Sequence, residues 1–302
     1  MQHTFKKGLF DRYDGWRVRN VDAVFGIIPF ILRTRIDSQN FFEENIPAEG
    51  IEAFVRKYKE EIPGLTFMHV IIAAMIRMLA LRPYLNRFVV WNKIYARDHI
   101  NLSLIIKRSV TDGGEETLVK PEFEPTDTVE DVVRRVTDII AENAPEGTVN
   151  GSDSASRIFR ALPAFLVRVA AFGMHNLDKI GLLPKVINRI SPWHCSLFLT
   201  NLGSLGIGPI YHHLYEFGTC SVFVAMGNKM KANSVTAAGA PHVHRFIGLK
   251  FVTDERICDG HYYAASMKLL RRLLANPEAL LAPPEAVVVD DGVAKKRIDI
   301  KA

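Results

Sequence analysis

The chain has 302 residues, of which 48% are hydrophobic and 24% are charged, a composition typical of a globular protein with one large domain or two small ones. Its formal charge of +5 is modest, and the lysines and arginines are scattered instead of forming a stripe, which argues against a dedicated nucleic-acid-binding protein. A phosphate-bearing small molecule is compatible with the same charge.

The sequence shows neither an export signal nor a membrane span. Its first 20 residues carry charges throughout, without the apolar run that export requires. The longest apolar stretch, 161–174, is interrupted by Arg168 and is shorter than the roughly 20 residues that cross a bilayer. The cysteines are too scattered for a disulfide framework or a zinc site: Cys195, Cys220 and Cys258. We therefore expect a soluble protein of the reducing cytoplasm that binds no metal.

The N-terminal half mixes helical and strand patterns. After an N-terminal arm, residues 1–24, we expect helices at 39–46, 51–62 and 67–83. The helix at 67–83 is apolar nearly all round, which predicts that it is buried. Runs rich in β-branched and aromatic residues predict strands at 87–96, 100–109 and 116–125.

The C-terminal half continues the same mixture. Thr128 and Asp131 have capping-box spacing at the start of a helix predicted for 128–143. Two amphipathic segments follow within 156–189, then strands at 195–201, 220–227 and 244–253, and a last helix at 262–277. Interleaved strands and helices predict one α/β sandwich domain, which we place at 25–282, with a poorly ordered tail at 283–302.

Several segments resemble the catalytic domain of the dihydrolipoamide acyltransferases of 2-oxoacid dehydrogenase complexes. These are "HVIIAAMIRMLALRPYLNRFVVWNKIYARDHINLSLIIKR", "SLFLTNLGSLGIGPI", "SVFVAMGNK" and "IGLKFVTDERICDGHYYAASMKLLRRLLANPEALL". They occur in consistent order over about residues 25–282. The resemblance implies a two-layer α/β sandwich of the chloramphenicol acetyltransferase-like type, with a mixed sheet covered by helices. We expect no lipoyl-bearing domain or peripheral-subunit-binding segment before the similar region, so the chain does not resemble a whole core subunit of such a complex.

The resemblance also implies which residues form the site. In the family, a histidine in the pattern H-x-x-x-D-G takes a proton from the acceptor, and a serine or threonine hydrogen-bonds the oxyanion. The aspartate of that pattern forms a structural ion pair with an arginine. Here the matching residues are Thr200 for the oxyanion donor and Asp259 with Gly260 for the turn. Asn201, Gly203 and Arg256 are expected to shape the same two segments.

The family's base is replaced in this chain. Glu255 stands where the histidine is expected, and the nearby His261 lies six residues further on. Proton abstraction from a thiol by glutamate is about 2 pKa units less favourable than by histidine. Glu255 is therefore a usable base only in an apolar pocket that raises its pKa. The alternative is that Glu255 pairs with Arg256 or another arginine and only holds the turn.

Other histidines are alternative functional residues. His212 and His213 follow the T-N-L-G segment, and one of them could replace the missing base, although a loop histidine is commonly bonded to backbone. His242 and His244 have the spacing of two ligands on one face of a strand, but no third ligand is evident. The sequence therefore predicts no metal site here.

Two basic features of the sequence are further candidate binding sites. Lys229 and Lys231 follow a predicted strand near the site and could contact the phosphates of coenzyme A; the alternative is a solvated turn. Arginines flank the apolar face of 156–189, and such helices can lie on an anionic membrane. We expect this segment instead to pack on its own core or on a neighbouring subunit.

Taken with the resemblance, the residues favour a coenzyme A-dependent acyltransferase. Coenzyme A or an acyl-CoA is the expected co-substrate, and a small thiol or hydroxyl compound is the expected acceptor. Because the family's site lies between subunits, the resemblance implies a homotrimer. The alternatives are a catalytically impaired scaffold or acyl-ligand-binding member of the fold, and a peripheral membrane lipid acyltransferase.

Overall fold

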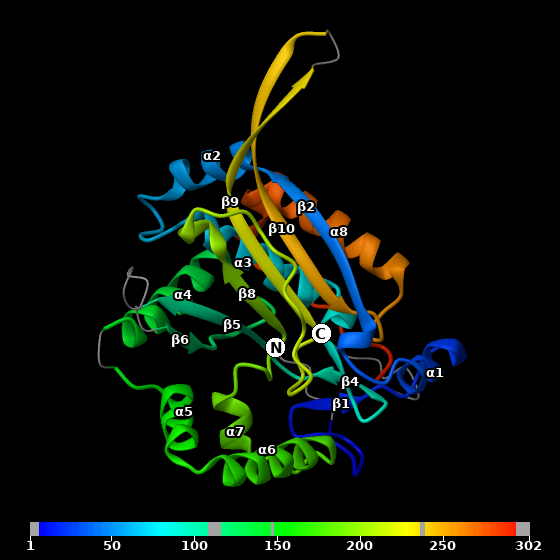
Figure 1. Cartoon of the computed structure of the whole chain (residues 1–302). Coiled ribbons are helices and arrows are strands. Elements are labelled where there is room, and N and C mark those ends of the chain that lie inside the picture. Colours follow the sequence, from blue (N-terminus) through cyan, green and yellow to red (C-terminus); the bar gives the residue numbers. More distant parts are fainter. Residues whose placement is uncertain (1–5, 108–115, 146–147, 236–238, 294–302) are drawn as a thin grey trace.

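The computed structural model describes residues 6–107, 116–145, 148–235 and 239–293 (Figure 1). Its centre is a 7-stranded mixed sheet in the order β2-β10-β9-β8-β5-β6, with β7 pairing beside β5. Its strands are β2 (Gln39–Pro47), β5 (Ile100–Lys107), β6 (Glu116–Val119), β7 (Glu122–Phe123), β8 (Leu197–Asn201), β9 (Val222–Val235) and β10 (Pro241–Asp254). Strand β8 runs parallel to both of its neighbours, β5 and β9.

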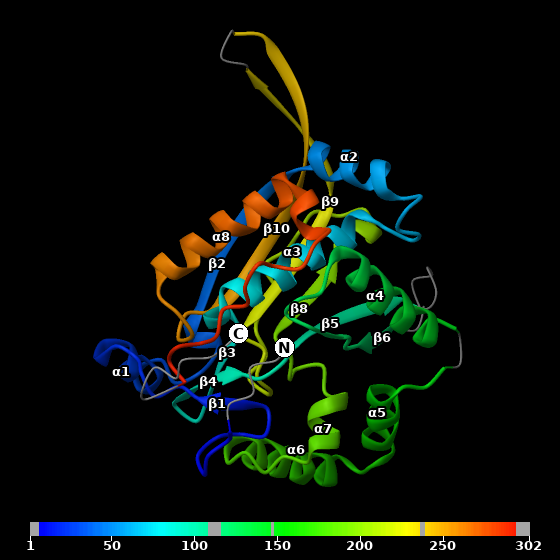
Figure 2. The same ribbon diagram turned by 180° about the vertical axis from the view of Figure 1, so that it is seen from behind.

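One face of this sheet is covered by helices (Figure 2). They are α2 (Ala48–Tyr58), α3 (Phe67–Leu81), α4 (Val129–Asn143) and α8 (Gly260–Ala275). Along β8, Leu197 and Leu199 belong to the core beneath the helices, whereas Phe198 packs in a separate cluster. Because side chains alternate along a strand, Thr200 lies on the same face as Phe198. We call this second face the front face.

The predicted helices at 51–62, 67–83, 128–143 and 262–277 are confirmed as α2, α3, α4 and α8. Within α3, twelve consecutive residues from His69 to Ala80 are buried, as its uniform hydrophobicity predicts. Thr128 and Asp131 form the expected capping box of α4. Short 3-10 helices occur at Ile36–Ser38, Pro83–Asn86, Leu202–Leu205 and Pro277–Leu280.

The prediction of a helix at 39–46 was wrong. This segment is strand β2, which pairs antiparallel with β10 from Gln39↔Asp254 to Pro47↔Phe246. The ring of Phe42 stacks on Phe251 of β10, with centroids 4.9 Å apart. Pairing with a neighbouring strand and aromatic packing across it override the local helical pattern.

Residues 87–96 form two strands instead of one. Strands β3 (Arg87–Val90) and β4 (Lys93–Arg97) pair antiparallel, and β1 (Gly15–Arg17) from the N-terminal arm pairs with the other edge of β4. Trp91 and Asn92 turn the hairpin at φ values of 46° and 59°, a left-handed conformation that asparagine tolerates. Helix α1 (Ala23–Ile31) follows β1.

Residues 283–293 of the predicted tail pack against the domain. Asp290 is buried, and both of its carboxylate oxygens lie 2.6 Å from the guanidinium of Arg87. The Val288 amide donates to Ala80 O at 3.0 Å. The expectation of poor order is therefore wrong for this part, because a buried arginine 203 positions earlier supplies its partner. Residues 294–302 lie outside the described residues.

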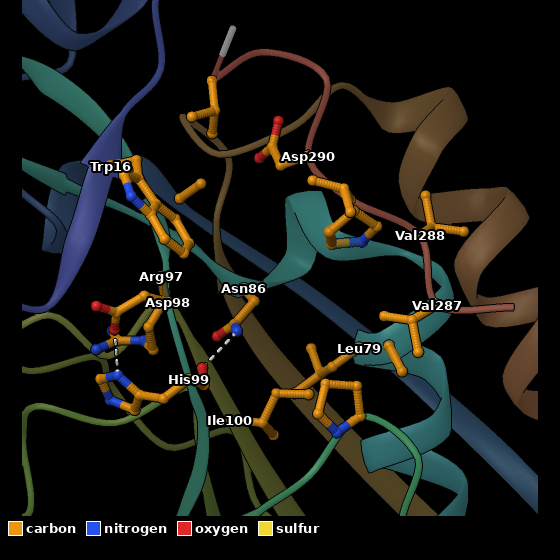
Figure 3. A pocket seen from close by; sticks show the side chains of 16 residues that line it. Trp16, Leu79, Asn86, Arg97, Asp98, His99, Ile100, Val287, Val288 and Asp290 are labelled. Atoms are coloured by element: carbon orange, nitrogen blue, oxygen red, sulfur yellow. Dashed lines mark hydrogen bonds and ion pairs between the residues drawn. The ribbon is translucent and has the colours of Figure 1, made fainter. Parts of the chain in front are cut away.

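The returning tail closes a cavity of about 100 Å³ at the end of α3 (Figure 3). Apolar side chains, among them Leu79, Val287 and Val288, form one side of the cavity. On its polar side, His99 Nδ1 lies 2.6 Å from Asp98 Oδ1. None of the residues predicted for the acyltransferase site lines this cavity.

The segment between α4 and β8 forms the opposite end of the molecule from the long β9–β10 hairpin (Figure 1). It contains three helices, α5 (Gly151–Ala161), α6 (Ala164–Lys179) and α7 (Lys185–Ile190). Helix α5 begins before the predicted position because Asn150 and Asp153 form a capping box. In the part of the chain that is described, no helix is both long and apolar enough to cross a bilayer.

Candidate functional site

Thr200 lies near the end of β8, where the chain leaves the sheet. It is half-buried, and its backbone neighbour in β9 is Ala225. The next residue, Asn201, caps the 3-10 helix Leu202–Leu205 by accepting from Ser204 N at 3.3 Å. The T-N-L-G segment thus ends a central strand and leaves the threonine side chain on the front face.

Glycines let the following loop cross the sheet closely. A Cβ on Gly203 would lie 2.6 Å from Gly227 O, and one on Gly227 would lie 2.3 Å from Pro209 Cδ. A Cβ on Gly248 of β10 would lie 2.8 Å from Pro209 Cγ. Since real Cβ atoms do not approach so closely, these glycines fix the path of the loop beside Thr200.

Glu255 lies in the turn after β10. Its backbone amide donates to Ser38 O at 2.9 Å, and its half-buried side chain has no hydrogen bond or ion pair with a described residue. Arg256 instead pairs with Asp254, at 2.8 Å from Nε and 2.7 Å from Nη2. The suggested pairing of Glu255 with Arg256 is therefore not formed.

A buried charge cluster supports this turn. Asp254 is fully buried and also lies 3.6 Å from Arg35 Nε, so one carboxylate faces two guanidinium groups. Arg256 Nη1 donates to Leu32 O at 3.1 Å. These contacts join the turn to the segment that follows α1.

Asp259 and Gly260 begin the last helix. The Asp259 side chain caps α8 by accepting from Tyr262 N at 2.8 Å, and among the described residues it has no ion pair with an arginine. The structural ion pair that the resemblance implies is therefore absent at Asp259, and Asp254 occupies the corresponding place beside Arg256. His261 is exposed in the first turn of α8.

The two halves of the expected site are far apart within one chain. Thr200 is level with Ala225, and Ala225 is level with Lys250. Glu255 follows Lys250 by five positions, a displacement of about 17 Å along the strand direction. A single chain therefore does not bring Thr200 and Glu255 into contact.

His212 packs on the front face. Its ring stacks on Phe223, with centroids 4.1 Å apart and planes 4° apart. Nδ1 donates to His213 O at 2.8 Å, and burial lowers the pKa of His212, so the neutral ring keeps Nε2 as an acceptor. His213 is more exposed and has its Nδ1 3.0 Å from Leu214 O. Both rings thus have the backbone contacts expected of loop histidines.

The expected phosphate-binding lysines lie on the outer part of β9. Lys229 Nζ is 2.7 Å from Glu52 Oε1, which partly neutralises it, whereas Lys231 is exposed. On the adjacent strand, the rings of His242 and His244 stack with centroids 6.1 Å apart. No group of three metal-ligating side chains occurs among the residues that the structure describes.

Lys250 is a front-face residue that the sequence analysis missed. Its Nζ lies 4.6 Å from the ring centroid of Tyr211, and Tyr211 packs edge-on against Phe41. The signal in the sequence that could have identified it is a lysine between the apolar residues of a central strand. It places a cation on the front face, level with Thr200.

The three cysteines lie inside the domain as free thiols. Cys195, Cys220 and Cys258 are all buried. Burial raises the pKa of the Cys258 thiol well above its ordinary value. A thiol in that environment is a poor nucleophile.

Comparison with known proteins shows the fold. No family model and no curated protein matches the sequence. A structure of a probable dihydrolipoamide acetyltransferase from Listeria monocytogenes superposes with a TM-score of 0.53 and 13% identity, covering 84% of this chain and 92% of the other.

Two further structures give the same result, each with a TM-score of 0.50, 14% identity and coverage of 86% of this chain and 89% of the other. One is the cubic core of a pyruvate dehydrogenase multienzyme complex, and the other is the dihydrolipoamide acetyltransferase of Azotobacter vinelandii. The chain therefore has the mixed α/β fold of the acyltransferase cores, the chloramphenicol acetyltransferase-like fold.

Proposed function

We propose that this protein is an acyltransferase that moves an acyl group between coenzyme A, or another thioester, and a small thiol or hydroxyl acceptor. The observation that carries this proposal is Thr200 on the front face, at the end of a central strand of an acyltransferase-type fold. A hydroxyl there can donate a hydrogen bond to the oxyanion of a tetrahedral intermediate. Glu255 is the proposed base. It lies in the turn after β10, at the position where the family has a histidine.

The proposed site is completed by a second copy of the chain. The separation of Thr200 from Glu255 supports this arrangement, because neither residue can serve the other within one chain. Apolar side chains in the chain after Thr200, together with Phe41, which packs against Tyr211, are exposed and available to such a copy: Phe41 at 55%, Leu205 at 50%, Ile207 at 48%, Ile210 at 46% and Tyr211 at 41%. In α1, Phe30 is 61% exposed. The segment that follows α1 contacts the turn that contains Glu255.

We expect the protein to be a homotrimer in solution. Multi-angle light scattering at micromolar concentration should give three times the mass of 34.0 kDa, or a multiple of the trimer. Tyr211→Ser with Ile210→Ser should weaken the assembly, because both residues lie exposed beside the site. A strict monomer would rule out a site shared between copies.

Coenzyme A is the proposed acyl carrier, with Lys231 and Lys229 near its phosphates. Acetyl-CoA at 100 times its dissociation constant should stabilise the fold by about 2.7 kcal/mol, which raises the melting temperature by about 5 °C. Differential scanning fluorimetry measures this shift. Lys231→Gln should reduce it, whereas Lys59→Gln, a control at an exposed site on another element, should not.

The shift in melting temperature, measured together with acyl transfer, separates catalysis from binding. A shift without measurable acyl transfer would indicate an acyl-ligand-binding member of the fold, because Glu255 then fails as a base while the coenzyme A site remains. No shift at millimolar acetyl-CoA would contradict coenzyme A as the carrier.

A further inference from the structure

Helix α6 has one partly buried face and one exposed apolar face. Of its residues, only Asp178 is buried. Phe165, Val169 and Phe172 recur at the i, i+4 and i+7 spacing of one helical face, and they are 64%, 65% and 73% exposed. Within one chain, the expected packing of this segment on its own core is therefore formed by only part of α6, and packing on a neighbouring subunit stays a prediction.

The exposed apolar surface continues beyond the helix. Ile180 and Leu182, in the link between α6 and α7, are 54% and 66% exposed, and Val186 of α7 is 70% exposed. Both views place α6 and α7 together at one end of the molecule, opposite the long β9–β10 hairpin (Figures 1 and 2). We call the six residues Phe165, Val169, Phe172, Ile180, Leu182 and Val186 the α6 surface.

The charges around the α6 surface have one sign. Residues 151–190, which span α5 to α7, contain six basic side chains, Arg157, Arg160, Arg168, Lys179, Lys185 and Arg189, and two acidic side chains, Asp153 and Asp178. Asp153 belongs to the capping box at the start of α5 and accepts from Thr117 Oγ1 at 3.1 Å. None of the six forms an ion pair with a described residue. Asp178 is buried against Arg12, with Nη2 2.7 Å from Oδ1, so it offers no negative charge at the surface.

The basic charge and the exposed apolar residues distinguish two candidate partners for the α6 surface, a second copy of the chain and an anionic lipid surface. Contact of the α6 surface with the same surface of a second copy would bring cations against cations without a carboxylate between them. An anionic lipid surface supplies the opposite charge and an apolar layer for the phenylalanines. Arg168 lies at the edge of the apolar face, where its long side chain can reach the headgroups.

We propose that the α6 surface binds the face of an anionic membrane, with α6 lying in the plane of the lipid headgroups. The contact needs no spanning helix. It is also independent of acyl transfer and of the coenzyme A site, because its residues take no part in either.

Sedimentation with lipid vesicles tests this proposal. The native protein should pellet with vesicles of 70% phosphatidylcholine and 30% phosphatidylserine, and should stay in solution with phosphatidylcholine alone. Each basic residue near the surface contributes a factor of about 5. Arg157→Gln with Arg160→Gln and Arg168→Gln should therefore lower the partition coefficient about a hundredfold.

Matched controls separate the surface from net charge and general hydrophobicity. Arg56→Gln with Lys57→Gln and Lys59→Gln removes the same charge from exposed positions around α2 and should change binding less than fivefold. Phe165→Ser with Phe172→Ser should lower binding at least tenfold. Val235→Ser with Val243→Ser, at positions 72% and 58% exposed on the β9–β10 hairpin, should not.

Three results would overturn the proposal. The first is a native protein that does not pellet with the anionic vesicles. The second is an equal loss of binding in the α2 control, which would show that only net charge matters. The third is a Phe165→Ser, Phe172→Ser variant with a smaller mass by light scattering and unchanged vesicle binding, which would make the α6 surface an interface between copies.

Discussion

Glu255→His is expected to raise the rate of acyl transfer from acetyl-CoA to a small thiol about a hundredfold. The reason is the match of proton affinities, because imidazole is a better base toward a thiol than a carboxylate by about 2 pKa units, or roughly 3 kcal/mol. Chromatographic separation of free coenzyme A from acetyl-CoA measures the rate. Glu255 is half-buried and its side chain has no hydrogen-bond or ion-pair partner among the described residues, so the substitution breaks no such contact.

Thr200→Ala in the Glu255→His background provides the control. Loss of one oxyanion donor typically costs a hundredfold to a thousandfold, so the gain should disappear. The double variant should keep its melting temperature, because a half-buried threonine near a strand end contributes little to packing.

A different set of results would assign the base to a histidine of the loop instead of Glu255. If the native protein is already active, Glu255→His brings no benefit and His212→Ala abolishes activity, then His212 is the base and Glu255 is not. His213→Ala is the matched comparison, because His213 is adjacent but more exposed and lacks the close stacking of His212 on Phe223.

Asp254→Asn is expected to destabilise the fold by about 3–5 kcal/mol. The substitution keeps the shape of the side chain but leaves the buried guanidiniums of Arg35 and Arg256 without their negative partner. Urea unfolding followed by circular dichroism measures the change in the free energy of unfolding.

Asp37→Asn is the control for this change. Asp37 is exposed in the segment that precedes β2, so its substitution should alter stability by no more than about 0.5 kcal/mol. Equal effects of the two substitutions would show that the buried cluster does not hold the Glu255 turn.

Local patterns in the sequence predict much of this fold. The periodicity of 67–83 and 128–143, and the capping pair Thr128 and Asp131, identify α3 and α4 because those signals lie within one element. The T-N-L-G segment and the D-G turn identify the strand end and the helix start on which Thr200 and Asp259 lie. The resemblance predicts the sheet type, which the similar structures confirm.

Features that depend on distant partners could not be predicted in this way. Strand β2 is fixed by pairing with β10, more than 200 positions later, and Asp290 is fixed by Arg87. Asp259 does not form the ion pair that the resemblance implies. Asp254, one residue before the turn that contains Glu255, pairs with Arg256 instead. Exposure of Phe165 and Phe172 likewise follows from tertiary structure, since an amphipathic pattern does not say what covers its apolar face.

Mixed assemblies test the shared site most directly. The Glu255→His, Thr200→Ala double variant carries the better base without the oxyanion donor, and the native chain carries the donor without that base. Co-expressed and purified together through different tags, the two chains should transfer acyl groups at least tenfold faster than either alone, because the turn of one copy then meets Thr200 of another. A mixture no more active than its two components, in assemblies shown to contain both chains, would contradict a site formed between copies.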